Sequence, residues 1–233
     1  MLNSTILIKS KERLNKLDSQ DYDNIECWQI VEAFNKGQVE WCRRQLVGTN
    51  LLKQGDEQSR RRVDDLQILL VVTPAVISNK KTYYEFPLAP DYFQYKRISA
   101  KGATPACTAG RPLVIYQAEE VNVPLLLRDE NKKPSFDWGE TFSTLVGNTA
   151  RIYTNGDFTL NSAEMMYYRQ PILIQVDGCV NPYTNLVSTV NVESEFKDDI
   201  VELLIDEAVK ILAGDIESIN QKQISEQNAE KNN

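Results

Sequence analysis

The segment Arg151-Ile-Tyr-Thr-Asn-Gly-Asp-Phe-Thr-Leu160 lies in the most β-rich part of the chain and decides the fold class. β-branched and aromatic residues stand on both sides of Asn155-Gly156, and this dipeptide suits the two positive-φ positions of a type I′ turn. The pattern predicts a β-hairpin in which Tyr153 and Phe158 form an aromatic cross-strand pair.

Working outward from this hairpin, short apolar and β-branched runs continue from Val63 to about Val192, separated by Pro, Gly and Asn. The predicted strands are Leu66–Thr73, Thr82–Phe86, Tyr92–Ala100, Pro112–Gln117, Ala150–Thr154, Asp157–Leu160 and Ile172–Val176. Seven strands at this spacing favour a sandwich or a partly open barrel.

Both ends of the chain have a helical pattern. A short helix is predicted from Ser4 to about Leu17, and a longer one from about Tyr22 to the glycine at 48. Gly37 lies inside the longer helix and is expected to weaken or bend it. Residues 195–213 carry one apolar stripe and form a third helix.

The predicted fold class is therefore α+β. A helical region spans residues 1–62, a β-rich body 63–192, an acidic amphipathic helix 193–213 and a polar, flexible tail 214–233.

The composition bounds the function. Hydrophobic residues make up 42% of the 233, which is enough for a sizeable core. No run approaches the ~20 apolar residues of a membrane helix, so no membrane partner is expected. The N-terminus lacks a basic segment followed by an apolar one, so synthesis and folding in a cytoplasm are expected.

Histidine is absent from the sequence. This excludes catalysis by Ser-His-Asp or Cys-His systems and His-ligated zinc or iron. No phosphate-binding or dinucleotide-binding glycine loop is present. Paired-carboxylate, lysine-based and carboxylate–metal chemistry remain open, but we expect no enzyme activity, no catalytic residue, no cofactor and no metal. The four cysteines are widely spaced and are expected to be free thiols, although two disulfides remain open outside a reducing compartment.

The charge is unevenly distributed. Residues 1–192 are neutral overall, and residues 193–233 carry the whole net charge of −7. A neutral body with an acidic end argues against a dedicated nucleic-acid-binding protein.

This asymmetry suggests a contact between copies of the chain, in which arginines face the acidic segment of a neighbour. Apolar residues of the C-terminal helix would supply most of the affinity in this contact. The alternative is that the helix packs on its own domain. The residues expected at the interface are Arg43, Arg44, Arg60, Arg61, Arg62, Ile200, Leu204 and Ile211.

A carbohydrate-binding or carbohydrate-cleaving β domain is an alternative function. Trp138 and Glu140 are the one aromatic–acid combination suited to sugar chemistry, and they would need to lie in an exposed groove.

Five segments of the chain resemble the tail-connector (ring) proteins of crAss-like bacteriophages. They are Lys11–Asn24, Trp28–Leu46, Phe86–Tyr95, Leu160–Ile172 and Phe196–Ile205. The resemblance covers most of the chain and rests on overall sequence texture, with no diagnostic motif and no catalytic residue.

The resemblance implies a structural virion protein, made in the host cytoplasm and located in the portal–tail connector. It would form a homo-oligomeric ring of twelve copies, contact neighbouring portal and tail proteins, and surround DNA without sequence-specific binding. Another virion part, such as a tail tube, a head-completion protein or a spike, remains an alternative.

Overall fold

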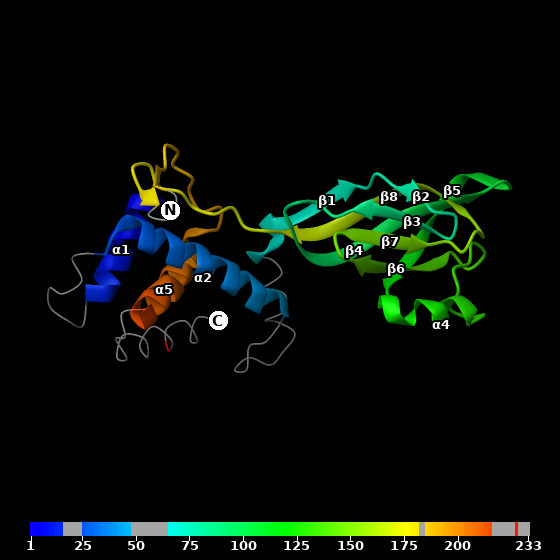
Figure 1. Ribbon diagram of the computed structural model, residues 1–233, viewed down its shortest axis with the longest axis horizontal. Helices are drawn as coiled ribbons and strands as arrows, with labels where there is room; N and C mark the ends of the chain where they lie inside the picture. The colour runs from blue at the N-terminus through cyan, green and yellow to red at the C-terminus, as the bar shows by residue number, and fades with distance from the viewer. Residues whose placement is uncertain (16–24, 48–64, 182–184, 216–226, 228–233) are drawn as a thin grey trace. The chain divides into compact units, whose positions relative to one another are not determined.

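A computed structural model describes residues 1–15, 25–47, 65–181, 185–215 and 227. The chain divides into two compact units (Figure 1). Residues 1–68 and 171–233 form a helical unit, and residues 69–170 form a sheet unit. The predicted α+β class is confirmed. The division differs from the predicted one because residues 171–192 return to the helical unit.

The helical unit combines both ends of the sequence. Its helices are α1 (Asn3–Asn15), α2 (Cys27–Val47) and α5 (Asp198–Asp215), and α5 packs against both others. The Trp41 ring of α2 meets Phe196, just before α5, edge to face with centroids 5.6 Å apart. The predicted polar tail, 214–233, lies almost entirely outside the described residues.

Gly37 lies where α2 and α5 approach each other closely. A Cβ atom added to Gly37 would lie 3.2 Å from the Cβ of Glu207, which is tighter than ordinary van der Waals contact. The helix α2 runs unbroken through Gly37. The missing side chain lets two helix backbones pack closely.

An extended segment follows the sheet unit and lies along the helices. Ile172–Val176 was predicted as a strand, but it forms only one isolated bridge, between Gln175 and Val192. Side-chain amides replace the missing sheet partners. Asn35 accepts a hydrogen bond from the Ile174 amide (2.8 Å) and donates one to its carbonyl (3.1 Å), while Gln38 donates to the Ile172 carbonyl (2.9 Å).

A small two-stranded ladder, β9 (Val180–Asn181) with β10 (Leu186–Val187), projects beyond that bridge. Asn3 of α1 holds the base of this projection, because its amide donates to the carbonyls of Gln175 (2.8 Å) and Val192 (2.9 Å).

The sheet unit is one curled, mixed sheet of eight strands in the order β1-β8-β4-β5-β6-β7-β3-β2 (Figure 1). Only β5 and β6 pair in parallel. The strands are β1 (Leu70–Pro74), β2 (Ser78–Asn79), β3 (Tyr83–Pro87), β4 (Tyr92–Thr104), β5 (Cys107–Gln117), β6 (Glu140–Val146), β7 (Thr149–Tyr153) and β8 (Thr159–Arg169). The edge strands β1 and β2 do not pair with each other, so the sheet is an open barrel.

Side chains alternate between two cores on opposite faces of this sheet. Along β7, Ile152 joins the larger core with Tyr84, Leu113 and Met165. The next residue, Tyr153, points to the other face and stacks on Phe142 with ring centroids 4.8 Å apart. The crossover from β5 to β6 covers this second core with η2 (Glu120–Asn122) and α4 (Val123–Arg128).

The predicted hairpin at residues 151–160 is wrong in its pairing. Asn155 (φ 50°) and Gly156 (φ 77°) do adopt the predicted left-handed conformation. However, β7 pairs with β6 and β3, while β8 pairs with β4 and β1. Tyr153 therefore stands opposite Tyr83, whereas Phe158 lies in the larger core. The turn connects two strands that are not neighbours in the sheet. Which strands pair depends on residues far apart in the sequence, so the local pattern does not predict it.

Replacing Gly37 by leucine should reduce the free energy of unfolding by about 1–2 kcal/mol. Overpacking against Glu207 costs up to about 3 kcal/mol and outweighs the gain in helix propensity of about 1 kcal/mol. Gly214→Leu is the matched control, because no atom lies within 4 Å of an added Cβ there. Urea denaturation followed by circular dichroism would measure both. An equal effect at the two positions would contradict the close-approach role.

Candidate interaction surfaces

An apolar groove of about 890 Å³ lies in the helical unit between α2 and the returning chain. One wall is a side of α2 that the buried stripe does not use. The other wall comes from residues 173–176, 179, 180 and 186–188. The α2 side presents Trp28, Val31, Asn35, Val39 and Arg43, at successive turns of the helix.

The groove is open and its apolar lining is exposed. Leu173 is 50% exposed, Val180 45%, Leu186 68% and Val187 52%. Contiguous exposed apolar surface of this kind usually marks an interaction site. Charged residues of α2, which include Glu32, Lys36 and Glu40, also line it. We call this surface, with the residues named here, the α2 groove.

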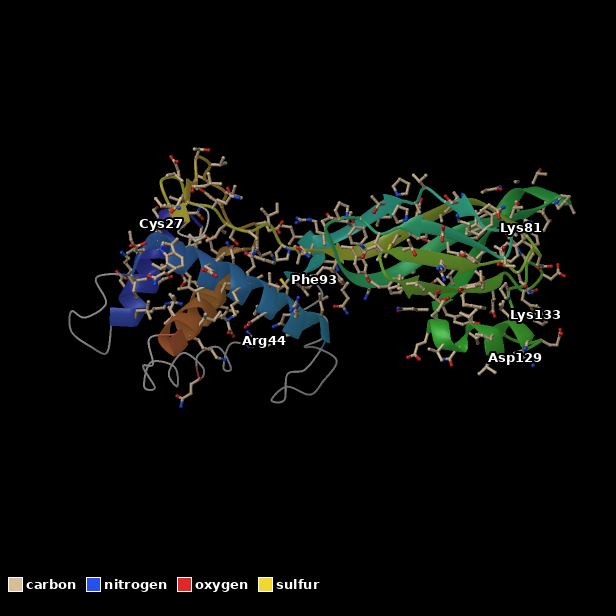
Figure 2. All side chains as sticks on the ribbon, viewed as in Figure 1. Cys27, Arg44, Lys81, Phe93, Asp129 and Lys133 are labelled. Carbon is tan, nitrogen blue, oxygen red and sulfur yellow. A yellow bond between two sulfur atoms is a disulfide. The ribbon has the colours of Figure 1, made fainter. Side chains whose placement is uncertain are left out.

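The predicted arginine cluster is only partly described. Arg43 lines the α2 groove and is exposed, whereas Arg44 forms an ion pair with Glu207 of α5 in its own chain (Figure 2 labels Arg44). Glu207 is 2% exposed, so this pair is part of the helix packing. Arg60, Arg61 and Arg62 lie outside the described residues.

The predicted apolar anchors on the C-terminal helix need correction. Ile200 is 3% exposed and Leu204 is fully buried, and both pack within their own helical unit. They stabilise their own fold and do not present a surface to a neighbouring copy. Ile211 is half-buried. The alternative, that this helix packs on its own domain, describes α5 correctly.

Two cysteines depart from the expectation of free thiols. Cys27, at the start of α2 (labelled in Figure 2), and Cys179, in the groove wall, form a disulfide with Cα atoms 5.9 Å apart. Cys42 and Cys107 are free, as predicted. Burial, reinforced by the charge of Glu195, raises the pKa of Cys42 to about 12, so this thiol is unreactive near neutral pH.

The sheet unit has exposed apolar residues of its own around the β5–β6 crossover. They come from β5, from the η2–α4 crossover and from the turn before β6. They are Val114 (65% exposed), Tyr116 (37%), Val121 (85%), Leu125 (68%) and Trp138 (82%). We call these five residues the crossover patch. Figure 2 labels Asp129 and Lys133 in the loop that follows α4, beside this region.

Polar contacts fix the crossover on the sheet. Glu120 accepts hydrogen bonds from Thr144 (2.6 Å), Arg151 (2.9 Å) and Tyr153 (3.1 Å). Tyr116 donates to the carbonyl of Lys132 (3.0 Å). These contacts hold the crossover patch on a rigid support, as an interaction surface requires.

Trp138 and Glu140 are both exposed and flank Gly139, which has a left-handed backbone (φ 68°). Their exposure meets one condition of the carbohydrate alternative. Among the residues that the structure describes, no group of three or more acidic or cysteine side chains is placed to hold a metal ion. Likewise, no described helix is both long and apolar enough to cross a membrane.

No protein-family model matches the chain, and no curated protein matches its sequence significantly. Function must therefore be argued from the two surfaces themselves.

Sequence reasoning missed both surfaces. One signal was present in α2, where Val31 and Val39 extend the apolar pattern beyond the stripe that α5 covers. Another was the apolar pair Leu186-Val187, which stands among turn-forming and polar residues with Val180 and Val190 nearby. Neither signal indicates that the two segments form one groove, because they are separated by the whole sheet unit.

The Arg44–Glu207 pair makes a sharp stability prediction. Arg44→Ala should reduce the free energy of unfolding by about 2–4 kcal/mol, because it leaves a buried carboxylate without its cation. The double variant Arg44→Met with Glu207→Leu should recover most of that loss, since no charge then remains buried. Chemical denaturation of the single and double variants would measure this. A double variant as unstable as Arg44→Ala would show that packing, and not charge pairing, dominates.

Proposed function

We propose that the protein is a structural, self-assembling component of a bacteriophage virion, which forms a ring in the connector between portal and tail around the DNA channel. The observation that carries the proposal is the presence of two different exposed apolar surfaces, one on each unit. A head-to-tail ring needs two such surfaces, because each copy uses one face toward the preceding copy and the other toward the next.

The two surfaces have complementary character. The α2 groove is concave, whereas the crossover patch includes Trp138, a large side chain that is 82% exposed. Exposed tryptophans that enter an apolar pocket are frequent hot spots of protein interfaces. The proposed contact therefore places the crossover patch of one copy in the α2 groove of the next.

Charge has a smaller role than the sequence suggested. Three of the acidic residues on the C-terminal helix form ion pairs within their own chain. Lys9 and Arg13 of α1 pair with Glu202, Arg13 also pairs with Asp206 (2.7 Å), and Arg44 pairs with Glu207. Apolar burial, at about 25 cal/mol per Å² of buried area, must supply most of the affinity.

The ring position, the number of copies and the neighbours in the particle come from the resemblance to crAss-like phage connectors. The two surfaces support assembly in general and would serve a tail-tube or head-completion protein equally well. The location of the chain in a virion, seen by labelling in electron micrographs, would separate these alternatives.

The exposure of Trp138 beside Glu140 favours one other function, carbohydrate binding. Aromatic rings on exposed turns can stack on sugar rings. A glycan array would reveal such binding. In that case Trp138→Ser should abolish glycan binding and leave the oligomeric state unchanged, which is the reverse of the result expected for a ring contact.

Variants of each surface should block assembly at low protein concentration. Leu186→Ser with Val187→Ser removes apolar area from the α2 groove, and Trp138→Ser removes it from the crossover patch. Light scattering after size exclusion should show a multi-chain mass for the wild type and the single-chain mass of 26.6 kDa for each variant. Ile8→Ser is the control, because Ile8 is 59% exposed on α1 outside both surfaces.

Mixing the two variants tests the head-to-tail arrangement itself. Each variant retains one intact surface, so an equimolar mixture should form a dimer and no larger species. Variants that assemble as well as the wild type, or a mixture that remains monomeric, would contradict the proposed contact.

A further inference from the structure

The outer wall of the α2 groove is a small structure with almost no core of its own. This ribbon comprises residues 177–181 and 185–190, with β9 and β10 at its centre. Its apolar residues Val180, Leu186, Val187 and Val190 are each 45–68% exposed. An isolated two-stranded ladder is at best marginally stable in water, so the ribbon needs contacts with the rest of the helical unit to keep its structure.

The backbone contacts of the ribbon are mostly internal. Gly178 donates to the Ser188 carbonyl (2.9 Å), and Ser188 donates to the Cys179 carbonyl (2.9 Å). The bridge between Gln175 and Val192, supported by Asn3, closes its base but lies outside the ribbon itself. Beyond that base, the disulfide between Cys179 and Cys27 attaches the ribbon covalently to α2.

We propose that the Cys27–Cys179 disulfide is a redox-sensitive latch for the α2 groove. When the disulfide is formed, the ribbon is held against the start of α2 and the groove has both walls. When it is reduced, the ribbon swings away about its base at Gln175 and Val192, and the groove loses its outer wall. The helical packing of α2 on α5 persists in both states, because the contacts that join these helices, among them the Arg44–Glu207 pair and the approach at Gly37, involve no ribbon residue.

The chemistry is thiol–disulfide exchange with a low-molecular-weight disulfide as the oxidant. One cysteine thiolate attacks a sulfur of the oxidant, which forms a mixed disulfide and releases one small thiolate. The second cysteine, deprotonated, attacks the mixed disulfide, forms the Cys27–Cys179 bond and releases the other small thiolate. Two protein thiols lose two protons and two electrons, and the small disulfide is reduced to two thiols. Reduction by excess small thiol is the reverse sequence.

Access and pairing both suit this role. Cys27 is half-buried and can be approached by small thiols, whereas Cys179, in the groove wall, is only 7% exposed. The Cα separation of 5.9 Å lies within the usual range for disulfides. Cys42 is buried and hard to ionise, so it does not compete for exchange.

The latch does not depend on the proposed ring. In the proposed ring, which uses the α2 groove, the contact between copies requires the oxidised form.

Hydrogen exchange of the full chain tests the latch. The protein is measured oxidised with glutathione disulfide and then reduced with a phosphine, with alkylation and mass analysis to count thiols. On reduction, the amides of Gly178 and Ser188 should exchange at least ~10-fold faster and approach the rate of an unstructured chain. The amides of Leu204 and Ile205 should stay at least ~100-fold more protected than the ribbon, since α5 remains packed.

Three variants complete the test. Cys27→Ser and Cys179→Ser should each show the fast ribbon exchange under oxidising conditions as well, while Cys107→Ser, in the sheet unit, should respond as the wild type does. The proposal is overturned if the ribbon keeps its protection after reduction, if ribbon and α5 lose protection together, or if four free thiols persist in glutathione disulfide. If a serine variant fails to fold, the comparison of oxidised with reduced wild type still decides between these outcomes.

Discussion

The close packing of α2 on α5 is the constraint on which the rest of the structure depends. It brings residues 27–47 against residues 198–215, so both ends of the chain belong to one unit and the sheet is an insertion between them. Gly37 makes the approach close, and the Arg44–Glu207 pair compensates the charge that this closeness buries. Loop-closure entropy opposes such a contact only weakly, because its cost grows with the logarithm of the length enclosed.

The groove follows from this arrangement. Once α5 covers one side of α2, the returning segment 171–176 lies along another, where Asn35 and Gln38 satisfy its backbone as a neighbouring strand otherwise would. The segment needs no sheet partner, so alternate apolar side chains such as Leu173 remain exposed while Ile174 is buried. The exposed apolar surface in the helical unit therefore results from the path of the chain as it returns from the sheet. In the sheet unit, the parallel pairing of β5 and β6 requires a crossover connection, and the crossover patch lies around that connection.

The sequence predicts the elements of this protein better than their partners. Helical period and turn residues identify α1, α2 and α5 and locate most of β3, β4, β5 and β7, because these signals are local. The strand β6 was missed, and so was most of β8, whose sequence Asn161–Arg169 mixes polar and apolar residues in a central strand. The Tyr153–Phe158 pairing failed although the turn dihedrals were right, since strand partners depend on residues far apart in sequence. The same limitation applies to the interface residues, where Ile200 and Leu204 have the pattern of any amphipathic helix and only the position of α2 shows that they are buried.

We propose that two different apolar surfaces, one on each unit, join copies of this chain into a closed ring. Electron microscopy of the purified, oxidised full-length protein, raised to a concentration at which scattering shows association, tests this most directly. The account predicts closed ring-shaped class averages with rotational symmetry and a central opening. Single particles of one chain at every concentration, or open filaments and two-fold dimers in place of rings, would contradict it.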